Sequence, residues 1–87
     1  MNPYQIQLTS KAEKQLRKLS PSIRKKILVE ILKLAQERFP NKFKPLIGKK
    51  SAQFRIRIGD YRVLYDVYDD DAVVLILIVG HRRDIYR

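Results

Sequence analysis

The stretch Phe54-Arg-Ile-Arg-Ile-Gly-Asp-Tyr-Arg-Val-Leu-Tyr65 decides the fold of this chain. It begins by alternating apolar side chains with arginine, which is the period-two pattern of a strand with one buried face. Gly59-Asp60 then predicts a short type II′ turn, because that turn takes glycine at its first central position. We therefore expect a hairpin whose second strand starts at Tyr61.

The length of the turn determines which residues face each other across the hairpin. Facing residues share a side of the sheet, so one side should be apolar and the other cationic. Arg57 should face Arg62, and like charges directly opposite cost about 0.2–1 kcal/mol. That pairing suits a surface that grips phosphate and offers nothing to a purely structural protein. The apolar side carries Phe54, Ile56, Ile58, Tyr61, Val63 and Tyr65, and the cationic side carries Arg55, Arg57 and Arg62.

Apolar periodicity in the rest of the chain predicts an element order of β-α-α-β-β-β. A weak strand over 4–8 precedes a short helix from Ser10 and a longer helix that begins at Ser20-Pro21 and ends before Pro40. Residues 41–51 form a loop. We expect an α+β fold of one domain, residues 1–87, with a helical hairpin packed on one face of a four-stranded antiparallel sheet.

The segment 72–79 is apolar at every position and should be the central strand, buried on both faces. It follows an acidic turn, Asp69-Asp70-Asp71. If that turn takes two residues, Leu75, Leu77 and Val79 add an apolar floor beside the arginines. A longer loop would change this register.

The net charge and the lack of cysteine limit the partners and the chemistry that this chain can have. Nineteen Lys and Arg against nine Asp and Glu give a net charge of +10, which favours a nucleic acid or an acidic protein over a merely solvated basic surface. The chain has no cysteine, so no thiolate chemistry is available. No signal peptide is visible, and the longest apolar run is too short to span a bilayer, so we expect a cytoplasmic protein.

The C-terminal tail should bring Arg82 or Arg83, and Tyr86, beside the cationic face. Attack of a 2′-hydroxyl on its own phosphodiester needs a base, charge balance on the phosphorane and a proton for the leaving oxygen. Two side chains offer a proton acceptor, His81 and Tyr86, and the residues alone also allow a strand-end histidine and an aromatic clip. No carboxylate cluster suggests a metal, so we expect chemistry without metal or cofactor.

The string Arg55-Ile-Arg-Ile-Gly-Asp-Tyr-Arg-Val-Leu-Tyr-Asp-Val and the ending Gly80-His-Arg-Arg-Asp-Ile-Tyr86 resemble the RelE branch of the RelE/ParE toxin superfamily. The resemblance covers essentially the whole chain, and its specific part is the C-terminal half. It implies a toxin of a type II toxin–antitoxin pair that cuts messenger RNA in the ribosomal A site, without metal, through the 2′-hydroxyl. Its implied partners are the ribosome, messenger RNA and an acidic, partly disordered antitoxin.

The resemblance also implies roles for individual residues. Arg62 would balance charge on the scissile phosphate, Arg82 would be the general acid or a second phosphate contact, and Tyr86 would be the base or would orient it. Arg55 and Arg57 stand where the best-studied members have lysine, which preserves charge but gives up protons less readily. Further contacts to the substrate are expected from Lys50, His81 and Arg83.

Two other functions remain open at this stage. A ParE-like toxin of the same fold would poison DNA gyrase and have no nuclease activity. Tyr86 after the arginine pair favours the nuclease, since ParE-like chains usually lack that tyrosine. A module that binds RNA or antitoxin with an inactive site is the third interpretation, and replacement of the two lysines is its best support.

Overall fold

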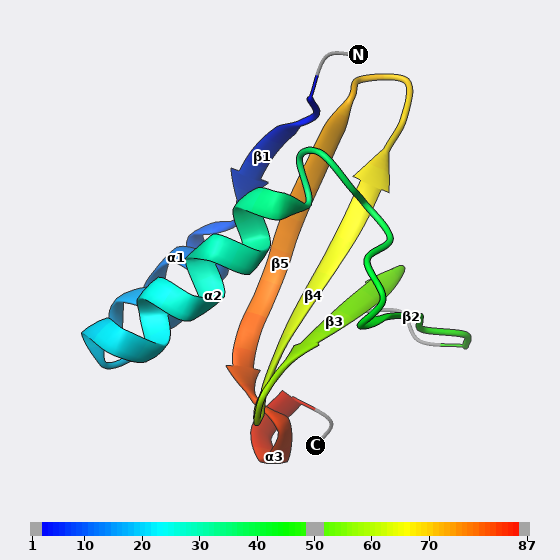
Figure 1. Cartoon of the computed structure of the whole chain (residues 1–87). Coiled ribbons are helices and arrows are strands. Elements are labelled where there is room, and N and C mark those ends of the chain that lie inside the picture. The colour runs from blue at the N-terminus through cyan, green and yellow to red at the C-terminus, as the bar shows by residue number, and fades with distance from the viewer. Residues whose placement is uncertain (1–2, 49–51, 86–87) are drawn as a thin grey trace.

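The computed structural model describes residues 3–48 and 52–85 of the chain. One strand comes first, two helices follow, and four more strands complete a single sheet before a short last helix (Figure 1). The elements in chain order are β1 (Gln5–Leu8), α1 (Ser10–Arg17), α2 (Pro21–Lys33), β2 (Phe43–Pro45), β3 (Phe54–Ile58), β4 (Tyr61–Tyr68), β5 (Val73–His81) and α3 (Arg82–Ile85).

The predicted α+β class is confirmed, but the sheet differs from the prediction. It has five strands in the order β1-β5-β4-β3-β2 and is mixed instead of antiparallel. β1 pairs with β5 in parallel, and the long crossover that parallel strands need is supplied by the chain between them. β2 lies in the segment predicted to be a loop. It is a three-residue edge strand that contains Pro45, and an edge tolerates the missing N–H of proline.

The hairpin of β3 and β4 has the predicted register, in which Ile58 faces Tyr61 and Arg57 faces Arg62. Gly59 has φ +59°, the left-handed value that a type II′ turn requires of its first central residue. The two-residue turn therefore determines the side of the sheet on which each arginine lies.

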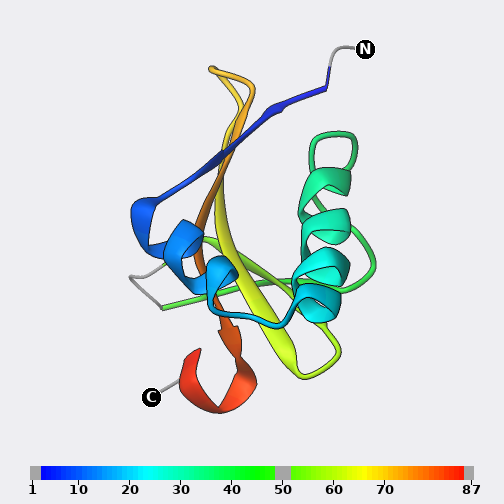
Figure 2. The same ribbon diagram turned by 90° about the vertical axis from the view of Figure 1, so that its left-hand side faces the viewer.

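The predicted apolar side of the hairpin faces the helices and forms the core. Figure 2 shows α2 standing against one face of the sheet. Tyr65 is fully buried there, its hydroxyl donates a 2.6 Å hydrogen bond to the carbonyl of Arg38, and burial raises its pKa above the usual value. Phe54 packs against this core. The buried members of the core are Ala12, Leu16, Ile27, Ile31, Leu34, Ile56, Val63, Tyr65, Val74, Ile76 and Val79.

The prediction that Leu75, Leu77 and Val79 form an apolar floor beside the arginines is wrong in part, because β5 contains a β-bulge. Leu64 pairs with Ile78 but the next residue, Tyr65, pairs with Ile76, so Leu77 is an extra residue without a partner on β4. The bulge turns Val79 toward the helices, where it joins the core. Leu75 stays on the arginine side, and Ile78 replaces Val79 there. An uninterrupted apolar run gives no signal for this shift, because either side of it can be buried.

Candidate nucleic-acid site

The arginines of the hairpin lie together on the face of the sheet that the helices leave uncovered. Arg55 and Arg57 come from β3, and Arg62 comes from β4 directly opposite Arg57. Arg57 is exposed, while Arg55 and Arg62 are half-buried. Arg55 faces Leu64, which is only 2% exposed. The cations therefore stand on an apolar base, where water screens them less than it would on an open helix.

The guanidinium of Arg62 is held against the β3–β4 turn. Its Nη1 donates to the carbonyl oxygens of Gly59 and Tyr61, both at 3.0 Å. These bonds use one nitrogen, and among the described residues no partner engages the Nε and Nη2 donors. An arginine fixed in this way presents the remaining part of its fork to an anion, which is the geometry that phosphate binding uses.

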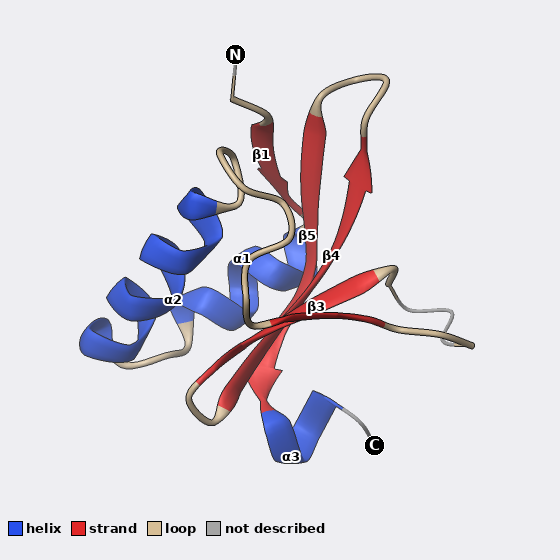
Figure 3. Ribbon diagram, turned by 45° about the vertical axis from the view of Figure 1, so that its right-hand side comes forward, coloured by secondary structure: helices blue, strands red, loops and turns tan. Residues whose placement is uncertain are grey.

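Arg82 reaches the same turn from the C-terminal side. Its backbone N–H donates a 2.8 Å hydrogen bond to the carbonyl of Asp60, and its Nε lies 3.8 Å from Asp60 Oδ1. Figure 3 shows α3 at the end of the sheet where β3 turns into β4. The structure therefore brings Arg57, Arg62 and Arg82 to one end of the molecule. Arg83 follows on α3 and is exposed.

His81 lies on the other side of the sheet. It faces Tyr61, with the two rings 5.4 Å apart at 77°, and Tyr61 belongs to the side that the helices cover. Its Nδ1 accepts a 3.2 Å hydrogen bond from the backbone N–H of Arg83, so the proton of the neutral ring sits on Nε2. The structure does not bring His81 together with the arginines. Instead, the ring accepts a backbone hydrogen bond at the start of α3.

Two other predicted site residues, Lys50 and Tyr86, lie outside the described residues. Three residues that were not predicted as site residues also belong to this end of the sheet. Asp60 contacts Arg82, and Gly80 faces Arg62 with Ile85 over it, so that a Cβ added at Gly80 would stand 3.2 Å from Ile85 Cγ1. A glycine at the end of an apolar strand and a lone isoleucine in a charged tail were the available signals.

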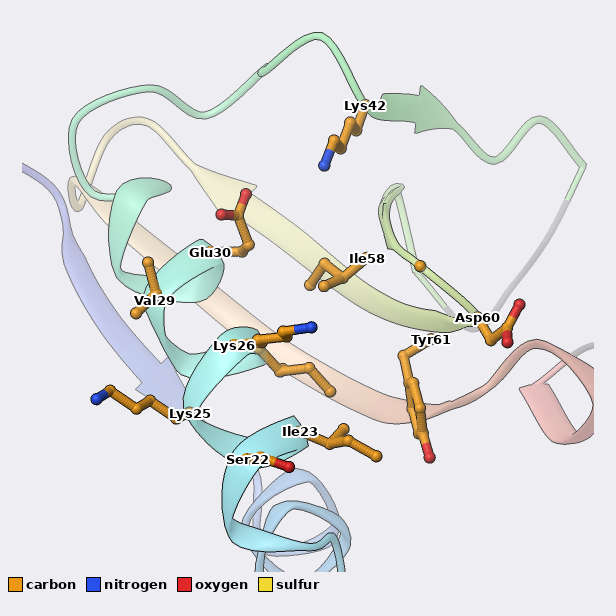
Figure 4. A pocket seen from close by; sticks show the side chains of 12 residues that line it. Ser22, Ile23, Lys25, Lys26, Val29, Glu30, Lys42, Ile58, Asp60 and Tyr61 are labelled. Carbon is orange, nitrogen blue, oxygen red and sulfur yellow. The ribbon is translucent and has the colours of Figure 1, made fainter.

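A second surface feature lies on the helical side of the hairpin. A groove of about 740 Å³ separates α2 from the β3–β4 hairpin. Ile23 from α2 and Ile58 and Tyr61 from the hairpin form its apolar walls (Figure 4). Lys26 and Lys42 extend toward the space from opposite sides. Lys25, Glu30 and Asp60 also line it, so the apolar walls are bordered by three lysines and two carboxylates.

Neither a metal centre nor a membrane segment is apparent in residues 3–48 and 52–85. These residues contain no group of three or more His, Cys, Asp or Glu side chains placed to hold a metal ion. Their helices are all too short or too polar to cross a membrane.

Comparisons with known proteins identify relatives over nearly the whole chain. A family model described as the ParE toxin of the type II toxin–antitoxin system matches residues 6–86. The toxin RelG of Mycobacterium tuberculosis is 38% identical over 89 aligned positions, which cover 98% of each chain.

Solved structures give the same result for the fold. A chain of the RelBE2 toxin–antitoxin complex of Mycobacterium tuberculosis superposes with a TM-score of 0.82 at 35% identity and covers 97% of both chains. A chain of the archaeal RelE–RelB complex of Pyrococcus horikoshii superposes with a TM-score of 0.80 at 28% identity, covering 94% of this chain and 98% of that one.

Proposed function

The chain belongs to the RelE/ParE superfamily of type II toxin–antitoxin toxins, and from that premise we propose that it is a ribosome-dependent endoribonuclease that cleaves messenger RNA. The observation that carries the proposal is the convergence of Arg62 and Arg82 on the β3–β4 turn, beside Arg57. Three guanidinium groups at one end of an uncovered sheet face suit a phosphodiester whose charge rises in the transition state.

The proposed reaction is an internal transfer at phosphorus. The 2′-hydroxyl gives its proton to a base, its oxygen bonds to phosphorus, and the bond from phosphorus to the 5′-oxygen breaks as that oxygen takes up a proton. The products carry a 2′,3′-cyclic phosphate and a 5′-hydroxyl. No water and no redox partner enters this step.

Each residue has a distinct task in this proposal. Arg62 balances the charge on the scissile phosphate, and Arg82 either binds a second phosphate oxygen or protonates the leaving 5′-oxygen. Tyr86, which lies outside the described residues, is the proposed base on the strength of the family resemblance, and guanidinium groups brought beside a phenol would favour the phenolate. Arg55, Arg57 and Arg83 hold the flanking backbone. His81 is the weaker candidate for the base because its ring lies on the helical side of the sheet.

The test of this proposal is cleavage of messenger RNA in programmed ribosomes by Arg62→Ala, with Arg17→Ala as the matched control. Arg17 is an exposed arginine of α1, so its replacement removes the same charge far from the hairpin. An arginine at a transferring phosphoryl group is worth about 10³–10⁵ in rate. We expect Arg62→Ala to lose about that factor and Arg17→Ala to cleave normally. Equal activity of both variants would refute the site.

Inhibition of DNA gyrase is the second candidate, because the matching family model is described by the ParE toxin. The names RelG and RelBE2 of the relatives at 38% and 35% identity favour the nuclease. A supercoiling assay separates the two functions. Gyrase inhibition by the purified chain without RNA cleavage would replace our proposal, and RNA binding with neither activity would indicate a binding module with an inactive site.

We further propose that an acidic antitoxin segment with apolar side chains docks in the groove between α2 and the hairpin. The relatives in solved structures include chains of complexes with RelB. Charge complementarity supports this surface, since three lysines against two carboxylates line an apolar groove, and Lys26 and Lys42 extend toward its space. Lys26→Glu should weaken neutralisation by the antitoxin, whereas Lys14→Glu, on the exposed side of α1, should not. Both the ribosome and such an antitoxin imply a cytoplasmic protein.

A further inference from the structure

The β3–β4 turn contacts the C-terminal segment through both the backbone and the side chain of Asp60. The bond from the N–H of Arg82 to the carbonyl of Asp60 continues the β4–β5 ladder beyond its last paired residues, Tyr61 and His81. The backbone of Arg82 is thereby fixed to the turn. This part of the contact depends on no side chain, so it would survive replacement of Asp60.

The side chain of Asp60 adds a second contact that its backbone does not provide. Its Oδ1 approaches Arg82 at Nε, 3.8 Å away. Both side chains are largely exposed, at 69% for Asp60 and 56% for Arg82. At this distance the contact is an ion pair and not a hydrogen bond. A carboxylate on the Nε side still attracts the guanidinium from that side and leaves the two Nη groups free to face another anion. These Nη groups are the ones that a phosphate would engage.

The rest of α3 is anchored by different groups. The ring of His81 accepts the N–H of Arg83, and Ile85 lies over Gly80. Neither contact touches the guanidinium of Arg82. Among the described residues, Asp60 is therefore the carboxylate that contacts Arg82 directly.

We propose that Asp60 is a positioning residue that orients the guanidinium of Arg82 toward the scissile phosphate. The inference rests on the proposed nuclease function and adds a residue to it. A carboxylate beside an RNA site repels the substrate and lowers the affinity for RNA. Orientation of Arg82 would offset this loss, because it raises the rate of the chemical step.

The two effects of Asp60 have opposite signs and can be separated. Loss of the carboxylate removes repulsion, so RNA should bind at least as tightly as before. Loss of orientation lowers the rate of the bound complex. An exposed ion pair is worth about 0.2–1 kcal/mol, which corresponds to a change of up to about fivefold in rate.

The experiment measures single-turnover cleavage in programmed ribosomes, with the rate at saturation and the half-saturating concentration taken separately. Asp60→Asn keeps the size and turn-forming tendency of the residue. We expect it to lower the saturating rate about two- to fivefold without raising the half-saturating concentration. Asp60→Glu should restore most of the rate. In the Arg82→Ala background, Asp60→Asn should have no further effect on the rate.

Asp84→Asn is the matched control, because Asp84 is an exposed carboxylate of α3 that forms no ion pair with the described residues. It should leave the saturating rate unchanged. An unchanged rate for Asp60→Asn, or an equal loss with and without Arg82, would overturn the proposal.

A spectroscopic measurement keeps the inference testable if the wild-type chain cleaves no RNA. The ¹⁵N–¹H resonance of Arg82 Nε should shift in Asp60→Asn and stay in place in Asp84→Asn. No shift in Asp60→Asn would overturn the positioning role whether or not RNA is cleaved. A shift in an inactive wild-type protein would instead show that the nuclease proposal is the part that fails.

Discussion

Replacement of Arg57 by glutamine should stabilise the fold and weaken the site at the same time. Arg57 stands directly opposite Arg62 across the hairpin. The N–H of Arg57 is directed to the carbonyl of Lys42 on the other side, at 3.4 Å. Arg57 and Arg62 are therefore a non-hydrogen-bonded pair, the kind in which facing side chains come closest.

The expected gain in stability can be estimated from this geometry. A pair of like charges directly opposite costs about 0.2–1 kcal/mol, and glutamine removes one of them while keeping most of the side-chain length. For a domain of this size, 1 kcal/mol shifts Tm by about 4–8 °C. We expect Arg57→Gln to raise Tm by about 1–8 °C. The same change removes one phosphate contact, so the slope of log K against log salt for single-stranded RNA should fall by about 0.7.

The control for the stability part is the same substitution in the Arg62→Gln background, where the facing charge is already absent. Arg55→Gln cannot serve, because Arg55 faces Lys44 of β2 and its loss also removes a like-charge pair. Thermal unfolding at low salt should show a larger gain for Arg57→Gln in the wild-type background than in the Arg62→Gln background. At about 1 M salt, where the Debye length is about 3 Å, the two gains should converge.

The combined result decides whether the arginine pair is kept for function. An Arg57→Gln protein that is no more stable than wild type and binds RNA with the same salt dependence would exclude both the charge repulsion and the phosphate contact of Arg57. A gain in stability with full cleavage activity would show that the charge repulsion is real but that Arg57 does not contact RNA.

Two further variants test other parts of the structure. In Gly80→Ala, the added Cβ would stand 3.2 Å from Ile85 Cγ1, so the Ile85 side chain must shift by a few tenths of an ångström. We expect that shift to disturb the position of Arg82 on α3 and to slow cleavage about two- to tenfold, with little change in Tm. Unchanged cleavage would show that the position of α3 does not matter. Tyr65→Phe should lower the free energy of unfolding by about 0.5–1.5 kcal/mol, measured by urea unfolding, since it loses the bond to the Arg38 carbonyl. Burial raises the pKa of Tyr65, so the neutral phenol stabilises the fold fully below its unfolded pKa of about 10, and this stabilisation is lost as pH rises through the folded pKa. Tyr65→Phe should therefore reduce the loss of unfolding free energy at alkaline pH. An equally steep loss in the variant would contradict this prediction.

The hairpin was predictable from sequence because local chemistry determines it. A two-residue turn with glycine first permits one register, and that register places every residue from Phe54 to Tyr65 on a definite side. The helical side of the core followed from the same alternation. The positions of Arg55, Arg57 and Arg62 on one face could therefore be predicted without any information on distant contacts.

The errors arose where pairing depends on distant segments. The parallel pairing of β1 with β5 joins residues from opposite ends of the chain, and β2 is too short and too poor in β-formers to be recognised alone. The bulge at Leu77 lies in a run without alternation. In each case the sequence near the element was compatible with more than one partner.

The placement of the candidate site residues could be predicted only in part, because some of it depends on distant contacts. Arg57 and Arg62 follow from the hairpin, whereas the direction of the tail after Gly80 depends on contacts that sequence does not display. The Asp60–Arg82 contact and the opposite facing of His81 are such consequences of tertiary structure.

Cleavage of a messenger RNA that carries a single 2′-deoxynucleotide at the scissile position in the ribosomal A site tests the central proposal most directly. We expect the wild-type chain to cut the all-ribose message, leaving a 2′,3′-cyclic phosphate and a 5′-hydroxyl, and to leave the deoxy-substituted message intact. Cleavage of the deoxy-substituted message, or fragments that end in a 5′-phosphate, would contradict it.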